Sequence, residues 1–192
     1  MNQKAEQKAK SHEAILESAY ALLRERGIKA SSVMDVMKGA GLTVGGFYGH
    51  FGSKEELFAT AIRTAASSVW DRLVSSAKGN TPAERVRDVV RRYLSRAHRD
   101  NAEAGCLLPS VAPEVAREGE PYREALETEL ASFVKTFGAT IGSGPEAREQ
   151  AVGLIALMFG ALSLSRAVKG TPLSDEFLLA ARKLADRALA QE

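Results

Sequence analysis

Apolar residues along the chain recur at three- and four-residue spacing, which is the period of an amphipathic helix. In the stretch SHEAILESAYALLRERG, one stripe is formed by Ile15, Ala19, Leu22 and Leu23. This spacing predicts a helix that ends at Gly27, because a glycine followed by an apolar residue is typical of a C-terminal cap. We find no segment in which apolar and polar residues alternate as they do in a half-buried strand. The pattern therefore predicts an all-α fold.

Capping residues mark where the predicted helices begin. Ser53 and Glu56 have the spacing of a capping box, and Thr81 followed by Pro82 has the order of an N-cap and a first-turn proline. Pro121 opens a further helix in the same way. Together these signals predict about nine helices joined by short loops. No linker is long enough to separate two independent domains.

Composition and charge narrow the classes of protein only slightly. The chain is 45% hydrophobic and 26% charged with a net charge of +2, so a nucleic-acid partner has to be argued from where the charge lies. A single cysteine excludes an intramolecular disulfide and fits a reducing compartment. The polar N-terminus lacks the apolar core of a secretory signal, and the apolar run over residues 151–165 is shorter than the roughly 20 residues that span a bilayer. We expect a soluble cytoplasmic protein.

One segment, VMDVMKGAGLTVGGFYGHFGSKEELF, carries a specific signal. Two short helices joined by a turn at Gly41 predict a helix-turn-helix, in which Gly41 adopts a positive φ and Thr43 caps the second helix with its hydroxyl. The stretch TVGGFYGHF is unusual, because each of its three glycines costs a helix about 1 kcal/mol relative to alanine. The expected core between the two helices consists of Val36, Ala40, Leu42 and Phe47.

This segment resembles the DNA-binding region of the TetR family of transcriptional regulators. The resemblance is carried by Ala40, Gly41, Thr43, Gly45, Tyr48, His50, Phe51, Ser53 and Lys54. Met37 departs from the pattern, because the family usually has a small alanine there. The resemblance implies an all-α protein with a three-helix DNA-binding domain over residues 8–68. It also implies a larger helical domain over residues 69–192 for effector binding and dimerisation.

The resemblance further implies which residues contact DNA. The family's phosphate-binding positions correspond to Ser32, Thr43, Tyr48, His50 and Lys54. Its groove-facing positions correspond to Val44, Gly45 and Gly46. Few side chains are left to read bases, so we expect phosphate contacts and DNA shape to carry much of the selectivity. A flexible basic arm at the N-terminus would add non-specific attraction through Lys4, Lys8 and Lys10.

Two predicted helices near the C-terminus carry the strongest apolar faces. Their apolar positions include Leu154, Leu157, Met158, Ala161, Leu162, Leu178, Ala181, Leu184 and Ala188. These faces could pack against a second copy as a four-helix interface, or they could be internal core. A helix-turn-helix protein gains from two-fold symmetry, because two half-sites double its DNA contacts. We therefore expect a homodimer on a palindromic operator.

A group of aromatic residues and one cysteine could line a cavity for a small-molecule effector, or could be ordinary core. The group consists of Trp70, Tyr93, Cys106, Phe133, Phe137 and Phe159. Cys106 follows Gly105 at a predicted helix start, where N–H groups lower the pKa of a thiol, so sensing of oxidants or electrophiles is one alternative and a small buried apolar residue is the other. We expect His98 to lie too far from Cys106 for a hydrogen bond, and we assign no function to His12 or His98.

These features favour a transcriptional repressor that an apolar or electrophilic effector releases from its operator. The sequence contains no carboxylate pair, metal-ligand cluster or phosphate-binding glycine loop, so we expect no catalytic site, metal or cofactor and no membrane partner. A relative that binds a partner protein instead of DNA is a further alternative. The presence of Thr43, Tyr48, His50 and Lys54 argues against it.

Overall fold

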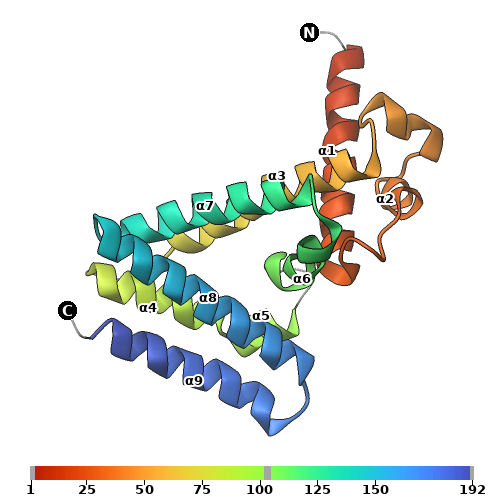
Figure 1. Cartoon of the computed structure of the whole chain (residues 1–192). Coiled ribbons are helices and arrows are strands. Elements are labelled where there is room, and N and C mark those ends of the chain that lie inside the picture. Colours follow the sequence, from red (N-terminus) through yellow and green to blue (C-terminus); the bar gives the residue numbers. More distant parts are fainter. Residues whose placement is uncertain (1–2, 102–104, 191–192) are drawn as a thin grey trace. The chain divides into compact units, whose positions relative to one another are not determined.

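The computed structural model describes residues 3–101 and 105–190, with the side chains of residues 65–68 excepted. Over these residues the chain forms nine α-helices and one 3-10 helix and no strand, which confirms the predicted all-α fold. The elements, labelled in Figure 1, are α1 (Gln3–Arg26), α2 (Val33–Gly39), η1 (Val44–Gly49), α3 (Lys54–Ser75), α4 (Pro82–Tyr93), α5 (Arg96–Asp100), α6 (Leu108–Glu118), α7 (Tyr122–Ile141), α8 (Pro145–Ala167) and α9 (Pro172–Ala188).

The chain divides into two compact units, and we describe each by itself. The first unit contains the described residues up to Ala66 together with Ser110–Glu129. The second contains Ser67–Pro109, except for the gap in the described residues, and the chain from Leu130 onward. The division falls inside α3 and inside α7. It lies close to the expected domain boundary in α3, but it groups the segment 110–129 with the N-terminal helices.

In the first unit, α1 is longer than predicted. It begins at Gln3, so the residues expected to form a flexible basic arm lie on a helix, and that expectation was wrong. The physical reason is local: Gln, Lys, Ala and Glu dominate this stretch and are good helix formers. Ile15, Ala19 and Leu23 are fully buried on the predicted stripe. Gly27 ends the helix with a φ of 77°, and its N–H donates to the carbonyl of Leu23 at 3.0 Å, which confirms the predicted cap.

Two contacts within the first unit join the end of α1 to α6. The Ser110 hydroxyl donates to the carbonyl oxygen of Arg24 at 2.8 Å. The backbone N–H of Ile28 donates to the Glu114 carboxylate. The first contact satisfies a carbonyl that the end of α1 leaves without a helical partner, and the second satisfies the N–H of Ile28, two residues beyond the helix. The helices of this unit thus fix the C-terminal end of α1.

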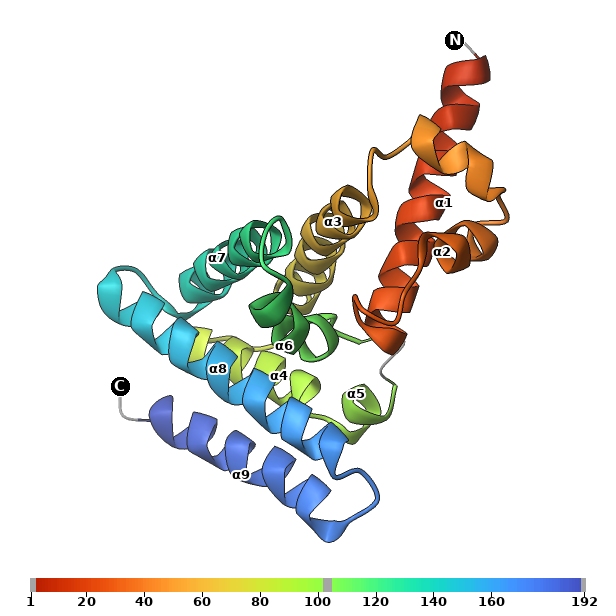
Figure 2. The same ribbon diagram turned by 45° about the vertical axis from the view of Figure 1, so that its right-hand side comes forward.

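In the second unit, α4 begins with the predicted capping box. Thr81 accepts from the backbone N–H of Glu84 at 3.2 Å, and the Glu84 carboxylate accepts from the N–H of Thr81 at 3.3 Å and from that of Asn80 at 2.7 Å. Figures 1 and 2 both show α8 and α9 side by side. Near the turn between them, the buried Ser174 hydroxyl donates to the carbonyl of Ser165 at 2.7 Å. This bond fixes the start of α9 against the end of α8.

Helix α8 is long and apolar enough to cross a membrane, judged by length and composition alone, and it is the one such helix in the described ranges. Its mean hydropathy reaches 1.4 over its most apolar window. A buried core helix passes the same test, and α8 buries residues such as Leu154, Met158 and Leu162 within the chain. Packing within the chain therefore accounts for part of its apolar character, since 39% of this window is buried.

Candidate nucleic-acid interface

The helix-turn-helix begins at Ser32, the N-cap of α2. The Ser32 hydroxyl accepts a hydrogen bond from the backbone N–H of Asp35 at 3.1 Å and donates to the Asp35 carboxylate at 2.6 Å. The bond from Ser32 also lowers the pKa of Asp35. This geometry places the start of α2 at Val33, directly after its N-cap. It also means that the Ser32 hydroxyl already has an anionic partner within its own helix.

Gly41 forms the turn after α2, as predicted. Its φ is 70°, the left-handed region that favours glycine, and its N–H donates to the carbonyl of Lys38 at 3.1 Å. The next N–H, of Leu42, donates to the carbonyl of Met37 at 2.9 Å. These two bonds close the C-terminal end of α2 and turn the chain toward the second element of the motif.

The second element, η1, differs from the expected α-helix because it is a 3-10 helix of six residues. Thr43 is its N-cap residue, but the prediction that the Thr43 hydroxyl caps the helix was wrong, because the hydroxyl makes no capping bond. The first bond of η1 instead joins the N–H of Gly46 to the Thr43 carbonyl at 3.0 Å, which is the tight spacing of a 3-10 turn. Three glycines in six residues favour this short tight helix over an α-helix. Thr43 is exposed.

The glycines of η1 are required neither by the backbone nor by packing. Gly45, Gly46 and Gly49 do not have positive φ values. A Cβ atom added at Gly45 or Gly49 would meet nothing within 4 Å, and one added at Gly46 would come only within 3.9 Å of the Met37 methyl group. The side chains that these positions lack would therefore extend away from the described chain. The surface of η1 leaves its backbone open to close approach from outside.

Aromatic residues hold η1 in place on one side and leave one ring outside. Phe47 is only 1% exposed, which confirms its predicted core position, and Phe51, at 3%, is also core. Their ring centroids lie 6.1 Å apart. Tyr48, in contrast, is 76% exposed. Val44 is also exposed, so the outer face of η1 carries Val44 and Tyr48 around the open glycines.

His50 belongs to a small group of basic residues that sequence reasoning did not assemble. His12 of α1 stacks on Phe51 with ring centroids 4.6 Å apart, and its ring lies 5.9 Å from that of His50. Burial lowers the pKa of His50, and the nearby His12 and Lys8 lower it further. The sequence did contain a signal for part of this group. His12 lies four residues after Lys8 and three before Ile15, which places His12 and Lys8 on one side of the helix, at the edge of its apolar stripe.

Lys54 begins α3 beside this surface. The N-cap of α3 is as predicted: the N–H of Glu56 donates to Ser53 at 3.1 Å and the N–H of Gly52 donates to Glu56 at 2.7 Å. The Lys54 Nζ lies 5.3 Å from the centroid of the buried Phe58 ring. This cation–π contact restricts the lysine without neutralising its charge.

In the second unit, three of the predicted effector residues border one cavity of about 330 Å³: Trp70, Tyr93 and Cys106. The Trp70 ring stacks on Phe133 at a centroid distance of 3.7 Å and on Tyr93 at 5.2 Å. Phe133 in turn stacks on Phe137 at 5.5 Å, so these two rings form a layer behind Trp70. Phe159 is half-buried and does not line the cavity.

Cys106 does not have the environment of an activated thiol. Helix α6 begins at Leu108, and Cys106 lies before it, 3% exposed. Burial raises the pKa of the thiol to about 11, so the expectation of a lowered pKa was wrong. The expected separation from His98 was also wrong: the backbone N–H of Cys106 donates to His98 Nε2 at 3.1 Å. The helix does not continue between them, because α4 ends at Tyr93 and α5 at Asp100.

The apolar residues expected at a subunit interface fall into two sets. Most are buried inside the single chain: Leu154, Met158, Ala161, Leu162, Leu178 and Ala181. The others are half-buried or exposed: Leu157, Leu184 and Ala188. This second set lines a groove of about 510 Å³ between α8 and α9. An apolar surface therefore remains on these helices after the chain has folded.

Comparison with known proteins agrees with both parts of this description. Residues 15–61 match the family described as bacterial regulatory proteins of the tetR family. Residues 82–180 match the tetracyclin repressor-like C-terminal domain. The first match includes the whole helix-turn-helix, and the second includes the cavity residues Tyr93 and Cys106.

Individual relatives are more distant. The HTH-type transcriptional repressor KstR2 of Mycobacterium tuberculosis is 45% identical over 49 residues, which cover 26% of this chain and 24% of that protein. The chain thus aligns with about a quarter of the length of this relative. The uncharacterised HTH-type transcriptional regulator YfiR of Bacillus subtilis is 27% identical over 139 residues, 72% of this chain and 67% of that protein.

Solved structures share the fold over nearly the whole chain. The reduced form of E. coli NemR has a TM-score of 0.79 at 21% identity, covering 92% of this chain and 95% of that chain. A transcriptional regulator from Rhodococcus sp. Rha1 has a TM-score of 0.72 at 26% identity, covering 94% of this chain and 96% of that chain.

Proposed function

Because the chain belongs to the TetR family of transcriptional regulators, a non-enzymatic family that binds DNA through a helix-turn-helix, we propose that it is a homodimeric repressor of a palindromic operator. A small-molecule effector bound in the second unit releases it. The repressor acts in the cytoplasm, where its operator lies. For the release to work, the effector has to bind the DNA-free form more tightly than the DNA-bound form.

The observation that carries the DNA-binding part of this proposal is the open glycine surface of η1. Glycine at Gly45 and Gly46 serves neither the local backbone nor the packing of the chain. It leaves room for a duplex to approach the backbone closely, with the exposed Tyr48 and the free Thr43 hydroxyl beside it. Backbone N–H groups and hydroxyls at such a place bind phosphates and fix the register of the protein on DNA.

Five further residues complete the proposed DNA surface. Lys54 supplies positive charge, and the imidazole rings of His50 and His12, which lie beside each other, supply N–H donors for phosphate oxygens. Val44 supplies methyl groups that can meet a thymine methyl in the major groove. Ser32 contributes to phosphate binding after its hydroxyl exchanges the Asp35 carboxylate for a phosphate oxygen.

The effector site in this proposal is the cavity bordered by Trp70, Tyr93 and Cys106. The Tyr93 hydroxyl is buried, and its neighbour within the cavity wall is the Cys106 thiol, which is only a weak hydrogen-bonding group. A ligand with a polar atom at this depth would offer the hydroxyl a stronger partner. The stacked rings of Trp70 and Phe133 form an apolar wall, so an effector with an apolar body fits best.

The thiol-sensing alternative is less well supported. A thiol with a pKa of about 11 is almost entirely protonated at neutral pH and reacts slowly with electrophiles. Cys106 would then act as part of the wall of the cavity. We expect Cys106→Ser to keep full release from DNA by every inducing electrophile. Loss of release by this variant, with operator affinity unchanged, would support the thiol sensor instead.

The apolar surface around Leu157, Leu184 and Ala188 serves dimerisation in this proposal. The residues that are already buried within the chain stabilise the α8–α9 pair from inside. The exposed set, on the groove side, is what a second copy would cover. Two-fold symmetry then presents two copies of η1 to the two half-sites of the operator.

The experiment that tests the proposed function is selection of genomic fragments by the purified protein, repeated with candidate effectors and oxidants. We expect enrichment of a short inverted repeat, and its loss when the effector is present. If no inverted repeat is enriched, the protein is not an operator-binding repressor, and the family member that binds a partner protein becomes the better explanation.

A further inference from the structure

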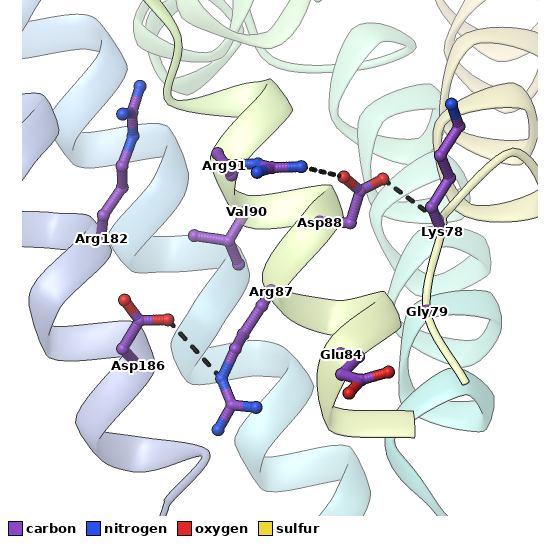
Figure 3. Close-up of a pocket in the computed structure, with 9 residues that line it drawn as sticks. All are labelled: Lys78, Gly79, Glu84, Arg87, Asp88, Val90, Arg91, Arg182 and Asp186. Carbon is purple, nitrogen blue, oxygen red and sulfur yellow. Dashed lines mark hydrogen bonds and ion pairs between the residues drawn. The ribbon is translucent and has the colours of Figure 1, made fainter. Parts of the chain in front are cut away.

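A second cavity of the second unit lies between α4 and α9, whereas the groove proposed for dimerisation lies between α8 and α9. Its volume is about 520 Å³, and Figure 3 shows the residues that line it, contributed by α4, by α9 and by the segment before α4. A smaller cavity of about 320 Å³ is lined by Arg96, Asp175, Leu178, Leu179 and Arg182. Arg182 borders both cavities. This arginine is therefore the residue that the two cavities have in common.

The carboxylates of the larger cavity are already engaged. Asp88 accepts from Arg91 at 2.8 Å and from the backbone N–H of Lys78 at 3.1 Å, and the Nε of Arg92 lies 3.0 Å away. These bonds, that from Lys78 first, lower the pKa of Asp88 and keep it ionised. Figure 3 shows the bonds from Lys78 and Arg91 as dashed lines. The Asp88 carboxylate is therefore not available as a counter-ion for Arg182.

The other carboxylates nearby are engaged in the same way. Asp186 pairs with Arg87 at 3.7 Å, and Glu84 is used in the capping box of α4. In the smaller cavity, Asp175 pairs with Arg96 at 2.6 Å and with Arg99 at 2.7 Å. Each of these acids thus has an arginine or a backbone partner of its own.

Arg182 is left without a counter-ion. Within residues 3–101 and 105–190 no carboxylate lies within ion-pair distance of it, and Figure 3 draws no bond from it to the other lining residues. One of its Nη atoms donates to the carbonyl of Leu94, and its Nε is buried with no hydrogen-bond partner. Burial lowers the pKa of Arg182, and the charges of Arg91 and Arg96 lower it further. A cation in this position costs free energy unless an anion accompanies it.

We propose that Arg182, with Arg91 and Arg96, forms a binding site for a small oxyanion on the face between α4 and α9. The guanidinium group offers a planar fork that matches carboxylate and phosphoryl oxygens. A turn of the Arg182 side chain away from Leu94 presents its Nε and an Nη to the anion together. Val90 on one side and Leu178 and Leu179 on the other give apolar walls, so the site takes a phosphorylated or carboxylated metabolite with a small apolar part.

This site is separate from the proposed effector cavity, since the two share no lining residue. It also does not depend on the proposed repressor function, because the anion can be tested on the free protein without DNA. An anion bound at Arg182 would tie the end of α4 to α9 by charge instead of by the Leu94 carbonyl. The folded protein would then be stabilised by an amount that rises with the logarithm of the anion concentration once the concentration exceeds Kd.

The test is isothermal titration calorimetry of the full chain with inorganic pyrophosphate and, separately, with citrate, both against chloride at matched ionic strength. We expect saturable binding of at least one of the two. Tighter binding of pyrophosphate assigns the phosphoryl class, and tighter binding of citrate assigns the carboxylate class. Absence of saturable binding of both anions would overturn the proposal.

Three variants make the test specific. Arg182→Gln should weaken binding by about tenfold or more, as loss of a charge-assisted pair does. Arg91→Gln should weaken it as well while leaving the Arg182–Leu94 contact intact, so it remains informative if Arg182→Gln folds poorly. Arg187→Gln, on α9 but outside both cavities, is the matched control and should bind as the unmodified protein does. Equal anion binding by all three variants, or an equal loss of anion binding in all three, would overturn the proposal.

Discussion

The Nε2 atom of His98 accepts a hydrogen bond from the backbone N–H of Cys106 at 3.1 Å, and this single bond ties α5 to the segment that precedes α6. The other ring nitrogen, Nδ1, lies 2.6 Å from the carbonyl oxygen of Tyr93. A backbone N–H can only donate and a carbonyl can only accept, so the neutral ring carries its proton on Nδ1. If Nε2 were protonated, its N–H would face the N–H of Cys106, and this hydrogen bond would be lost.

This arrangement predicts that the protein loses stability in mild acid. Burial lowers the pKa of His98 in the folded chain, whereas the unfolded chain titrates near its usual value of about 6.5. Below that value the unfolded chain binds more protons, so the free energy of unfolding falls as the pH falls. Urea unfolding at about pH 7.5 and about pH 5.5 should show the loss, and His98→Gln should reduce it. His50 has a lowered pKa of its own, so some loss remains. An unchanged pH dependence in His98→Gln would contradict the assignment.

Gly45→Ala should separate folding from DNA binding. The added methyl group meets nothing within 4 Å in the chain, and Gly45 does not have a positive φ, so the free energy of unfolding should change by no more than about 0.5 kcal/mol. Operator affinity should fall by about tenfold or more, because the methyl group holds the backbone away from the duplex. Gly142→Ala, which also has no positive φ, is the matched control and should bind normally. Normal operator binding by Gly45→Ala would remove η1 from the interface.

Val44→Ala should change affinity more than base preference. Val44 is the exposed aliphatic side chain of η1, and its methyl groups can contact only a thymine methyl group. If phosphate contacts and DNA shape carry most of the selectivity, repeated fragment selection with Val44→Ala will enrich the same inverted repeat. A clear shift of the preferred bases would show that direct reading dominates instead.

Lys54→Ala should weaken binding to all DNA sequences alike. Removal of one phosphate contact lowers the slope of log K against log salt by about one for each subunit. The lost cation–π contact with Phe58 should have only a minor effect on stability, because Lys54 is not buried. Lys135→Ala, an exposed lysine of the second unit, should leave the slope unchanged. Equal slopes for Lys54→Ala and the unmodified protein would show that this lysine does not contact DNA.

Leu184→Glu should produce a monomer that is still folded. Leu184 is 51% exposed in the single chain and lines the groove between α8 and α9, so a charge there disrupts a subunit interface without entering the core. Light scattering after size-exclusion chromatography would measure the mass. Leu179→Glu is the control, since Leu179 is equally exposed but borders the Arg182 face instead. A dimeric Leu184→Glu protein would place the interface elsewhere.

Local chemistry in the sequence predicted the features that depend on near neighbours. The sequence pattern predicts Gly27 and Gly41 as turn glycines and Phe47 as core, and the structure agrees with all three. The failure at Thr43 has a local cause as well: the hydroxyl was expected to cap an α-helix, and the 3-10 geometry of η1 does not use it.

Tertiary relationships were beyond the sequence pattern. The contact between His98 and Cys106 joins α5 to a residue outside that helix, which spacing along one helix does not predict. The contact of His12 with Phe51 joins two elements far apart in the sequence. Arg182 is similar, because its lack of a counter-ion becomes visible only when α4 and α9 are packed together.

The bare surface of η1 bears on how this protein could acquire a new operator. Where side chains read bases, specificity changes when one side chain replaces another. Here the positions nearest the duplex in the proposed complex are glycines with free space beyond them, so few base-reading side chains are present to be replaced. A change of target would come by addition, as a glycine codon mutates to one for alanine, serine or arginine. Each such step would first weaken binding to the old site, so divergence of paralogous regulators would pass through a period of low occupancy.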